Sequence, residues 1–373
     1  DVFLRKAIPL TELSFYQQER GKPLTDKSML MKKHFVFLSM LLLAVSCSDP
    51  TNDITLVNSP EGNFESLWKT IDQQYCYLGQ KGINWDSVHT AYLPRVQELE
   101  SKDPASRELF DLMAEMLNLL NDGHVNLYSD FDVSRAIGWY ENYPENFNSS
   151  LIYSERYLGQ DYKRAGGLYY EKIGEEKVGY IRYDSFASSF SSANLWHVFD
   201  YFKECEGVII DVRNNGGGNL NYANSLASAF FTQQTTVGYI QHKTGPGHND
   251  FSEPEARIIS PHKSCQWQRP VVVLINRQSY SATNEFACSM QYAPLATLMG
   301  GISGGGGGIP LSYELPNGWV VRFSAVPMYD AEMNPIEDGI APDIEVELTD
   351  SAIAQGEDNI IEEAIRHITN QQK

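Results

Sequence analysis

The chain has 373 residues and carries 48 acidic against 29 basic side chains, which gives a formal net charge of −19 at pH 7. A chain this acidic repels nucleic acid and anionic surfaces, so no nucleic-acid partner is predicted. None of the five cysteines belongs to a Cys-x-x-Cys pair or lies near a histidine at metal-ligand spacing, so a zinc site is not predicted either.

The first 46 residues are not expected to be part of the fold. Residues 1–30 have no sustained apolar period and begin with Asp1, and we interpret them as an upstream extension that does not belong to the native protein. In residues 31–46, two lysines and a histidine precede the apolar run from Phe35 to Val45, which is the order of a secretory signal peptide. The apolar run is too short to span a bilayer permanently.

The end of this signal, Leu43-Ala44-Val45-Ser46-Cys47, resembles a bacterial lipobox, although Ala44 stands where leucine is usual. The resemblance implies that Cys47 is lipidated and that residues 47–62 form a polar tether. The protein would then be anchored in the cell envelope, on the periplasmic side or in the outer membrane. The alternative is plain secretion after cleavage near Ser46.

Apolar side chains at three- and four-residue spacing predict a small N-terminal helical domain over residues 63–130. One helix is indicated by Phe64, Leu67, Trp68, Ile71 and Tyr75, and a second by Leu109, Leu112, Met113, Met116 and Leu117. The second helix is expected to begin near Asp103 and Pro104 and to end at Asn121-Asp122-Gly123. A short strand from Val125 to Tyr128 is expected to follow.

His124 is the histidine that we single out. It follows a turn glycine at a helix-to-strand corner, and Asp122 places a carboxylate beside its imidazole. This setting favours a functional role, because an imidazole titrates near neutral pH and can act as a general base. The alternative is an ordinary structural histidine, which is how we interpret most of the others.

Residues 131–165 show no clear period and are predicted to be an irregular connection. In residues 166–373, short apolar runs alternate with helical patterns, which predicts βαβ crossovers and a largely parallel sheet covered by helices. The expected strands include 178–183, 207–212 and 237–241, and the expected helices include 194–202 and 222–231. The continuous apolar run of residues 207–212 makes it the predicted central strand.

Two glycine-rich segments interrupt this core. Gly216 to Gly218 follow the central strand and can turn backbone N–H groups toward a ligand, so we interpret this loop as a backbone oxyanion donor. A nucleotide-binding loop is not favoured, because the Walker lysine and the dinucleotide spacing are both missing. The second segment, Gly304 to Gly308, is either the mobile lip of a cleft or only a long flexible turn, and the turn is preferred.

Ser281 lies at a predicted strand-to-helix corner. Val271 to Ile275 form a wholly apolar run typical of a buried strand, and Ala282 to Met290 have the composition of a helix. Ser281 would then lie in front of the unpaired N–H groups of the helix, where negative charge is stabilised, and could act as a nucleophile. The alternative is that its hydroxyl merely caps the helix.

The remaining residues predict three simple elements. Pro316-Asn317-Gly318 has the composition of a hairpin turn between strands 311–315 and 319–323. A polar loop is expected over residues 335–343. The chain then closes with a helix that is capped by Asp358.

Four stretches, in this order, resemble the tail-specific or C-terminal processing serine proteases and their relatives in the tricorn protease core. They are Asp122-Gly123-His124, Asp211 to Gly218, Ser279 to Glu285, and Gly339-Ile340-Ala341-Pro342-Asp343. The resemblance covers about residues 63–350. It implies an α/β fold with a crotonase-like (ClpP/crotonase) β/α spiral core and a small N-terminal helical domain. It also implies that Ser281 is the nucleophile and that the N–H groups of Ala282 and Gly217 form the oxyanion hole.

One departure from the family concerns the catalytic base. Many members use a lysine that follows the nucleophile helix, but glycines, Gly304 to Gly308, occupy that place here. The tricorn-type branch uses a histidine and a glutamate instead, and His124 and Glu337 match them. The resemblance therefore implies that His124 is the general base and that Glu337 orients it.

These assignments predict a serine endopeptidase of the bacterial envelope that cleaves unfolded or peptide substrates through an acyl-enzyme at Ser281, without a metal or cofactor. Residues 131–165 are too few for the PDZ module that usually captures substrate C-termini in this family, so tail specificity is not assumed. The alternative is a catalytically inactive member that binds peptides or small apolar ligands in the same cleft.

Overall fold

A computed structural model of the chain describes residues 57–370, and those from Asn58 onward belong to one compact unit. The predicted extension, the signal over residues 31–46 and Cys47 lie outside the described residues. The predicted tether ends earlier than expected, because α2 (Pro60–Gln74) begins at Pro60, where the Ser59 side chain accepts a hydrogen bond from the Gly62 N–H group. Between residues 57 and 370, no helix is long and apolar enough to cross a membrane.

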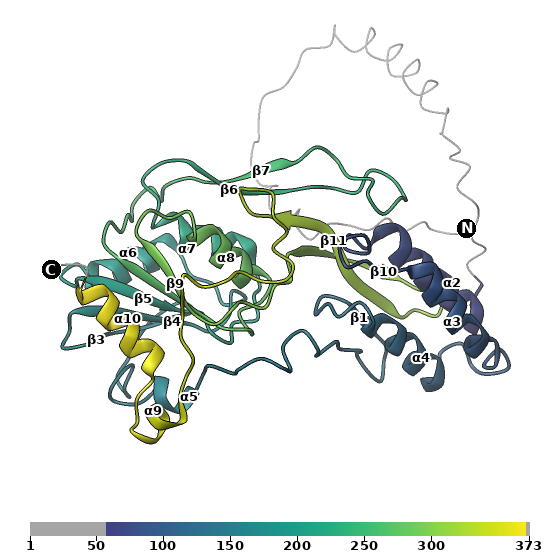
Figure 1. Ribbon diagram of the computed structural model, residues 1–373, viewed down its shortest axis with the longest axis horizontal. Helices are drawn as coiled ribbons and strands as arrows, with labels where there is room; N and C mark the ends of the chain where they lie inside the picture. Colours follow the sequence, from purple (N-terminus) through teal and green to yellow (C-terminus); the bar gives the residue numbers. More distant parts are fainter. Residues whose placement is uncertain (1–56, 371–373) are drawn as a thin grey trace, which may run out of the picture. The chain divides into compact units, whose positions relative to one another are not determined.

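A seven-stranded sheet lies at the centre of the larger core (Figure 1). Its order is β12-β9-β8-β5-β4-β3-β2, with parallel pairing from β12 to β4 and antiparallel pairing from β4 to β2. Its strands are β2 (Lys163–Ala165), β3 (Leu168–Ile173), β4 (Val178–Tyr183), β5 (Gly207–Asp211), β8 (Val271–Ile275), β9 (Ala296–Gly300) and β12 (Ile344–Glu345). The structure thus confirms the predicted parallel sheet and places β5 near its middle.

Helices cover both faces of this sheet. Successive side chains of β5 point to opposite sides, so Val208 and Ile210 pack with the helices of one layer while Ile209 packs with α10 on the other. The first layer contains α6 (Ser192–Tyr201), α7 (Leu220–Ser228) and α8 (Ala282–Met290), and the second contains α10 (Asn359–Asn370). Burial on both faces explains the continuous apolar runs of the central strands.

A second sheet is antiparallel and has the order β1-β11-β6-β7, with β10 paired to β11. Its strands are β1 (Asn126–Tyr128), β6 (Thr235–Ile240), β7 (Glu255–Ile259), β10 (Gly308–Glu314) and β11 (Val320–Tyr329). The predicted hairpin is confirmed as β10 and β11. However, β6 lies in this sheet and not in the parallel one, because it is only half-buried and a parallel strand needs cover on both faces.

Three helices precede the sheets, namely α2, α3 (Trp85–Gln97) and α4 (Arg107–Asn118). They share a hydrophobic core with the second sheet, which contributes Val321 and Phe323 of β11. The helix α3 was not predicted, because few of its side chains are buried. The helix α4 begins after the cap Ser106, later than predicted, and the domain boundaries at residues 130 and 165 stay a prediction.

Residues 131–165 are largely irregular, as predicted, and contain only α5 (Ser149–Ile152) and β2 as regular elements. Near the C-terminus, α9 (Asp350–Ala354) precedes α10, and Asp358 accepts hydrogen bonds from the Ile360 and Ile361 N–H groups, as expected of a cap. The four cysteines among the described residues are buried and not bonded to one another.

Candidate active site

Ser281 occupies a strained corner between β8 and α8. Its backbone has φ +59° and ψ −120°, a region that a residue with a side chain rarely adopts and that costs of order 1–3 kcal/mol. The Ser281 N–H group donates to the Gly305 carbonyl at 2.9 Å, and the Ser279 hydroxyl donates to the Val212 carbonyl at 2.8 Å, which holds the corner against β5. The Ser281 side chain makes no capping hydrogen bond to α8, so the capping interpretation is wrong.

The structure brings His124 to this serine. The distance from His124 Nε2 to Ser281 Oγ is 3.0 Å, although the two residues lie 157 positions apart in the chain. The imidazole is buried and packs edge-on against the Tyr280 ring, with centroids 5.0 Å apart. A nucleophile within hydrogen-bond distance of an imidazole is the arrangement that base-activated acyl transfer requires.

Glu337 does not lie where the sequence analysis placed it. Its Oε1 atom is 3.0 Å from Lys81 Nζ, and its Oε2 atom accepts a hydrogen bond from the Gly307 N–H group at 3.0 Å. Among the described residues, none forms a hydrogen bond with His124 Nδ1. Glu337 contacts Lys81 and not His124, because Lys81, from the loop after α2, reaches its carboxylate. Burial and the nearby Asp122 raise the pKa of Glu337 to about 8, yet both oxygens accept hydrogen bonds as an ionised carboxylate does.

Asp122 is a buried carboxylate whose part in the site the sequence indicates only by its place beside His124. It is 1% exposed, and its two oxygens accept hydrogen bonds from a set of donors in four segments: the His124 N–H group at 2.7 Å, Ser324 Oγ at 2.8 Å, Tyr75 OH at 3.0 Å and Tyr280 OH at 3.2 Å. Burial alone would raise its pKa, but His124, Lys81 and these donors hold it below its usual range. Asp122 thus keeps a negative charge beside the imidazole and ties His124 to the corner of Ser281.

We expect Asp122→Asn to lower kcat on the order of 100-fold, because the imidazolium that forms during the reaction would lose this negative charge. The pKa of His124 should fall further in the variant, since Asp122 is the larger of the two influences that raise it, the other being the Gly308 backbone. NMR titration of the imidazole measures this shift, which a purely structural role would not produce. Glu337→Gln is the matched control, and an equal or larger loss in that variant would contradict the importance of Asp122.

The two predicted oxyanion donors both lie beside the serine. Gly217 has φ +95°, and a Cβ added to it would come within 2.8 Å of Ser281 Cβ, so only glycine fits there. The Ala282 N–H group begins α8 and has no hydrogen-bond partner among the described residues. The Gly217 N–H group, in contrast, donates to Asn215 Oδ1 at 3.0 Å. Ala282 is therefore open to an oxyanion, whereas Gly217 must first leave Asn215.

The second glycine run is not a flexible turn, contrary to the expectation from its composition. Gly304 to Gly308 are all buried, and the run packs between the Ser281 corner and Glu337. The Gly304 N–H group donates to the Ser279 carbonyl at 2.8 Å. A Cβ added to Gly305 would lie 1.7 Å from the Glu337 carbonyl oxygen, so the absence of side chains allows this close packing. The run is a closely packed wall of the site.

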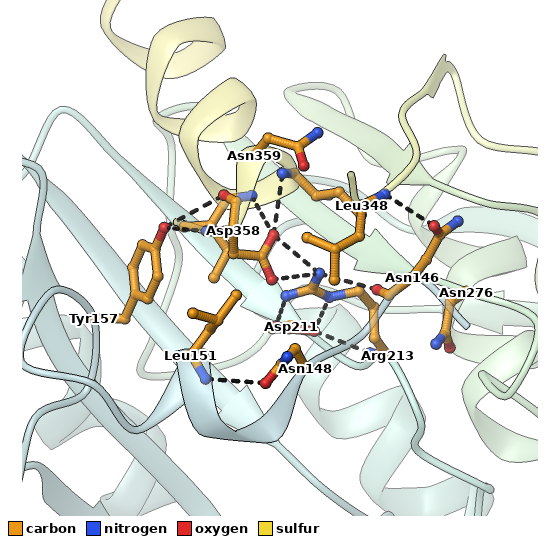
Figure 2. A network of polar contacts seen from close by, with 12 residues as sticks. Asn146, Asn148, Leu151, Tyr157, Asp211, Arg213, Asn276, Leu348, Asp358 and Asn359 are labelled. Atoms are coloured by element: carbon orange, nitrogen blue, oxygen red, sulfur yellow. Dashed lines mark hydrogen bonds and ion pairs between the residues drawn. The ribbon is translucent and has the colours of Figure 1, made fainter. Parts of the chain in front are cut away.

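A buried ionic network supports the end of β5, from which the loop of Gly217 begins (Figure 2). Arg213 is fully buried and contacts Asp211 Oδ2 at 2.6 Å and Asp358 Oδ2 at 3.0 Å. Its guanidinium also donates to the Asn146 carbonyl at 3.2 Å. The network therefore joins β5, the residue that caps α10 and the irregular connection behind the site.

The burial of His124 shifts the expected pH dependence. Burial lowers its pKa from the usual 6.5 to about 4, with Asp122 opposing the shift. An imidazole must be neutral to accept the serine proton, so the acid limb of kcat/KM should lie near pH 4 to 5 and not between roughly pH 6 and 7, as an ordinary histidine would give.

The same shift acts on stability. Between pH 4 and 6.5 the unfolded chain holds a proton on His124 that the folded chain lacks, so the contribution of His124 to the free energy of unfolding falls as the solution is acidified. The raised pKa of Glu337 acts in the opposite sense. Rates must therefore be measured where circular dichroism shows a folded protein.

An acid limb of kcat/KM that rises only toward pH 9 to 10 would indicate a lysine base instead of His124.

Comparison with known proteins agrees with this geometry. Residues 177–346 match the family model described as Peptidase family S41, and residues 57–118 match the model described as Tricorn protease C1 domain. A candidate peptidase from Parabacteroides merdae, known from its crystal structure, is 46% identical, with a TM-score of 0.78 over 83% of this chain and 96% of that chain.

Two more distant proteins extend the comparison. Carboxy-terminal processing protease CtpA of Bacillus subtilis is 24% identical over 49% of this chain, and the match covers 38% of that protein's length. The structure of mature CPAF complexed with lactacystin is 12% identical, with a TM-score of 0.63 over 84% of this chain and 98% of that chain, a likeness of fold alone. These likenesses confirm the predicted crotonase-like α/β fold class.

Proposed function

The chain belongs to peptidase family S41, and from that membership we propose that it is a serine endopeptidase that cleaves unfolded or peptide substrates through an acyl-enzyme at Ser281. The observation that carries the proposal is the 3.0 Å contact between Ser281 Oγ and His124 Nε2. The strained backbone of Ser281 supports it, because such strain persists at functional sites when the surrounding structure holds it in place.

In the acylation step, Ser281 Oγ attacks the carbonyl carbon of the scissile peptide bond while its proton passes to His124 Nε2. The carbonyl oxygen becomes an oxyanion, which the Ala282 N–H group stabilises together with Gly217 once the latter has left Asn215. Asp122 stabilises the positive imidazolium. The tetrahedral intermediate then collapses, the C–N bond breaks, and His124 gives its proton to the leaving amine.

In the deacylation step, a water molecule replaces the amine. His124 accepts a proton from this water as the water attacks the acyl carbonyl, and it returns the proton to Ser281 Oγ when the ester bond breaks. The products are two shorter peptides and the starting enzyme. Every proton transfer in this sequence uses one imidazole, which is neutral at pH 7 because of its lowered pKa.

The test is cleavage of a reduced and alkylated, unfolded protein by the purified chain, with the fragments identified by mass spectrometry. Internal cleavage that is lost in Ser281→Ala is the expected result. Binding of the same substrate without any cleavage by the unsubstituted protein would contradict the proposal and favour an inactive peptide-binding member of the family.

We also propose that the protein is held in the bacterial cell envelope by a lipid on Cys47, on the strength of the lipobox-like sequence before it. Cys47→Ser should then move the protein from the membrane fraction to the soluble fraction, because the acyl chains provide the membrane affinity. Ser48→Ala is the matched control and should stay with the membranes. Fractionation with immunoblotting measures the outcome, and unsubstituted protein found only in the soluble fraction would contradict the anchor.

A further inference from the structure

A cavity of about 440 Å³ opens beside the catalytic residues. Three of the residues that line it, Gly123, Gly216 and Tyr280, directly precede His124, Gly217 and Ser281. A peptide whose scissile carbonyl lies at Ser281 must therefore pass this cavity within a few residues of the bond that is cut. Its volume is in the range that holds a ligand group.

Much of the wall of the cavity is apolar and comes from β1 and the irregular segment after it. The apolar lining residues are Tyr128, Val133, Ala136, Ile137, Trp139 and Tyr140. Tyr128 is 38% exposed and Ile137 is 44% exposed, so both can contact an incoming chain. These side chains suit the aliphatic part of a substrate residue.

Arg135 is the only charged side chain among the described residues that line this cavity. It makes no hydrogen bond or ion pair with any residue between 57 and 370, although its charge acts on the neighbouring Asp132, which pairs with Arg107 at 3.1 Å. Asn214 adds a second donor, because its Oδ1 atom accepts from Asn276 Nδ2 and leaves its own amino group without a partner in the described chain. Arg135 and Asn214 together can donate hydrogen bonds to an acceptor group of the substrate, although the chain as a whole has a net charge of −19.

We propose that this cavity is a substrate subsite that binds a carboxylate, with Arg135 as the residue that recognises it. The carboxylate comes from an acidic side chain or from the C-terminus of the substrate, since both present the same pair of oxygens to a guanidinium. This inference rests on the proposed peptidase function of Ser281.

A neighbouring cavity of about 360 Å³ shares Trp139 and Tyr280 with this subsite but has the opposite character. It is lined by three carboxylates, Asp122, Glu337 and Asp338. Its two cations are already engaged, because Lys81 pairs with Glu337 and Arg277 donates to the carbonyls of Ser303 and Asp338. This neighbouring cavity therefore offers a substrate carboxylate no free cation, in contrast to the subsite of Arg135.

Peptide binding to the Ser281→Ala protein tests the proposal without cleavage. A neutral, fluorescently labelled peptide would be made in a series with glutamate or its isostere glutamine at each position in turn. A second series would end in a free carboxylate or an amide. Dissociation constants would be measured by fluorescence anisotropy for each peptide.

We expect one position of glutamate, or the free C-terminus, to bind about 5- to 10-fold more tightly than its neutral counterpart, as befits a partly exposed charge-assisted contact. Adding Arg135→Gln should remove this preference, and Lys263→Gln, which removes an exposed cation outside the cavity, should leave it intact. A higher salt concentration should weaken the preference for the charged peptide. The two peptide series separate a side-chain carboxylate from a terminal one.

Equal affinities for the charged and neutral peptides in both series would overturn the subsite, as would a preference that survives Arg135→Gln or a complete lack of peptide binding. Failure of the proposed function gives a different result. In that case, the peptides bind with the charge preference but the unsubstituted protein never cleaves them. Cleavage without any charge preference contradicts the subsite alone.

Discussion

Replacing His124 by alanine should lower kcat for an unfolded substrate by about 10⁴-fold or more, close to the loss for Ser281→Ala. The two side chains lie 3.0 Å apart and act as a unit, since a serine hydroxyl is a poor nucleophile without a base to take its proton. The loss should appear in kcat more than in KM, because the imidazole does not contact the remote parts of a peptide. Initial rates with a quenched fluorescent peptide measure both parameters.

Lysine substitutions are the matched controls for this experiment. Lys243→Ala and Lys263→Ala should have little effect on kcat. Lys81→Met is the sharper test, because Lys81 Nζ lies 3.0 Å from Glu337 within the site. The assignment of the base would be contradicted if His124→Ala cleaved at the unsubstituted rate while one of these lysine variants was inactive.

Replacing Arg213 by methionine should lower the free energy of unfolding by about 3–5 kcal/mol. Methionine keeps much of the volume but removes the charge that faces both Asp211 and Asp358, and all three side chains are fully buried (Figure 2). Asp358 would then lie in the core without a countercharge, and Asp211 would keep only Arg182, whose Nη1 atom lies 3.3 Å from Asp211 Oδ1. Urea denaturation followed by circular dichroism measures the loss from the transition midpoint and slope.

Arg366→Met is the control for Arg213→Met. Arg366 pairs with Glu363 on the exposed side of α10, and surface pairs of this kind contribute about 0–1 kcal/mol. Equal losses in the two variants would contradict the special role of the buried network. If Arg213→Met folds at low temperature, its activity should also fall, because the loop of Gly217 begins at the end of β5 that the network supports.

The Ser281 corner could be predicted from the sequence because its determinants are local. The apolar run Val271–Ile275 and the helix-forming run Ala282–Met290 have the same bounds in the structure as in the prediction. The pairing of His124 with Ser281 is different, because 157 residues separate them. No local pattern brings two such residues together, and only the order of the four family motifs suggested it.

Two features of the site depended on contacts that no motif contains. Lys81 lies in a turn without a recognisable pattern, so its pairing with Glu337 could not be foreseen. The role of Asp122 was signalled only by its place beside His124, because its donors Tyr75, Tyr280 and Ser324 come from distant segments. The composition of Gly304 to Gly308 even favoured the wrong conclusion. Glycine runs are usually flexible in isolation. Here, because glycine has no side chain, the run can pack tightly against its neighbours.

Labelling with a fluorophosphonate probe tests the central claim most directly, because the probe forms a covalent bond only with a serine hydroxyl that a neighbouring base activates. Peptide mapping by mass spectrometry should place the adduct on Ser281 in the full-length protein, and His124→Ala should abolish labelling while the variant remains folded. A folded, unsubstituted protein that takes up no probe at pH 7, or that carries the adduct on another serine, would contradict the account.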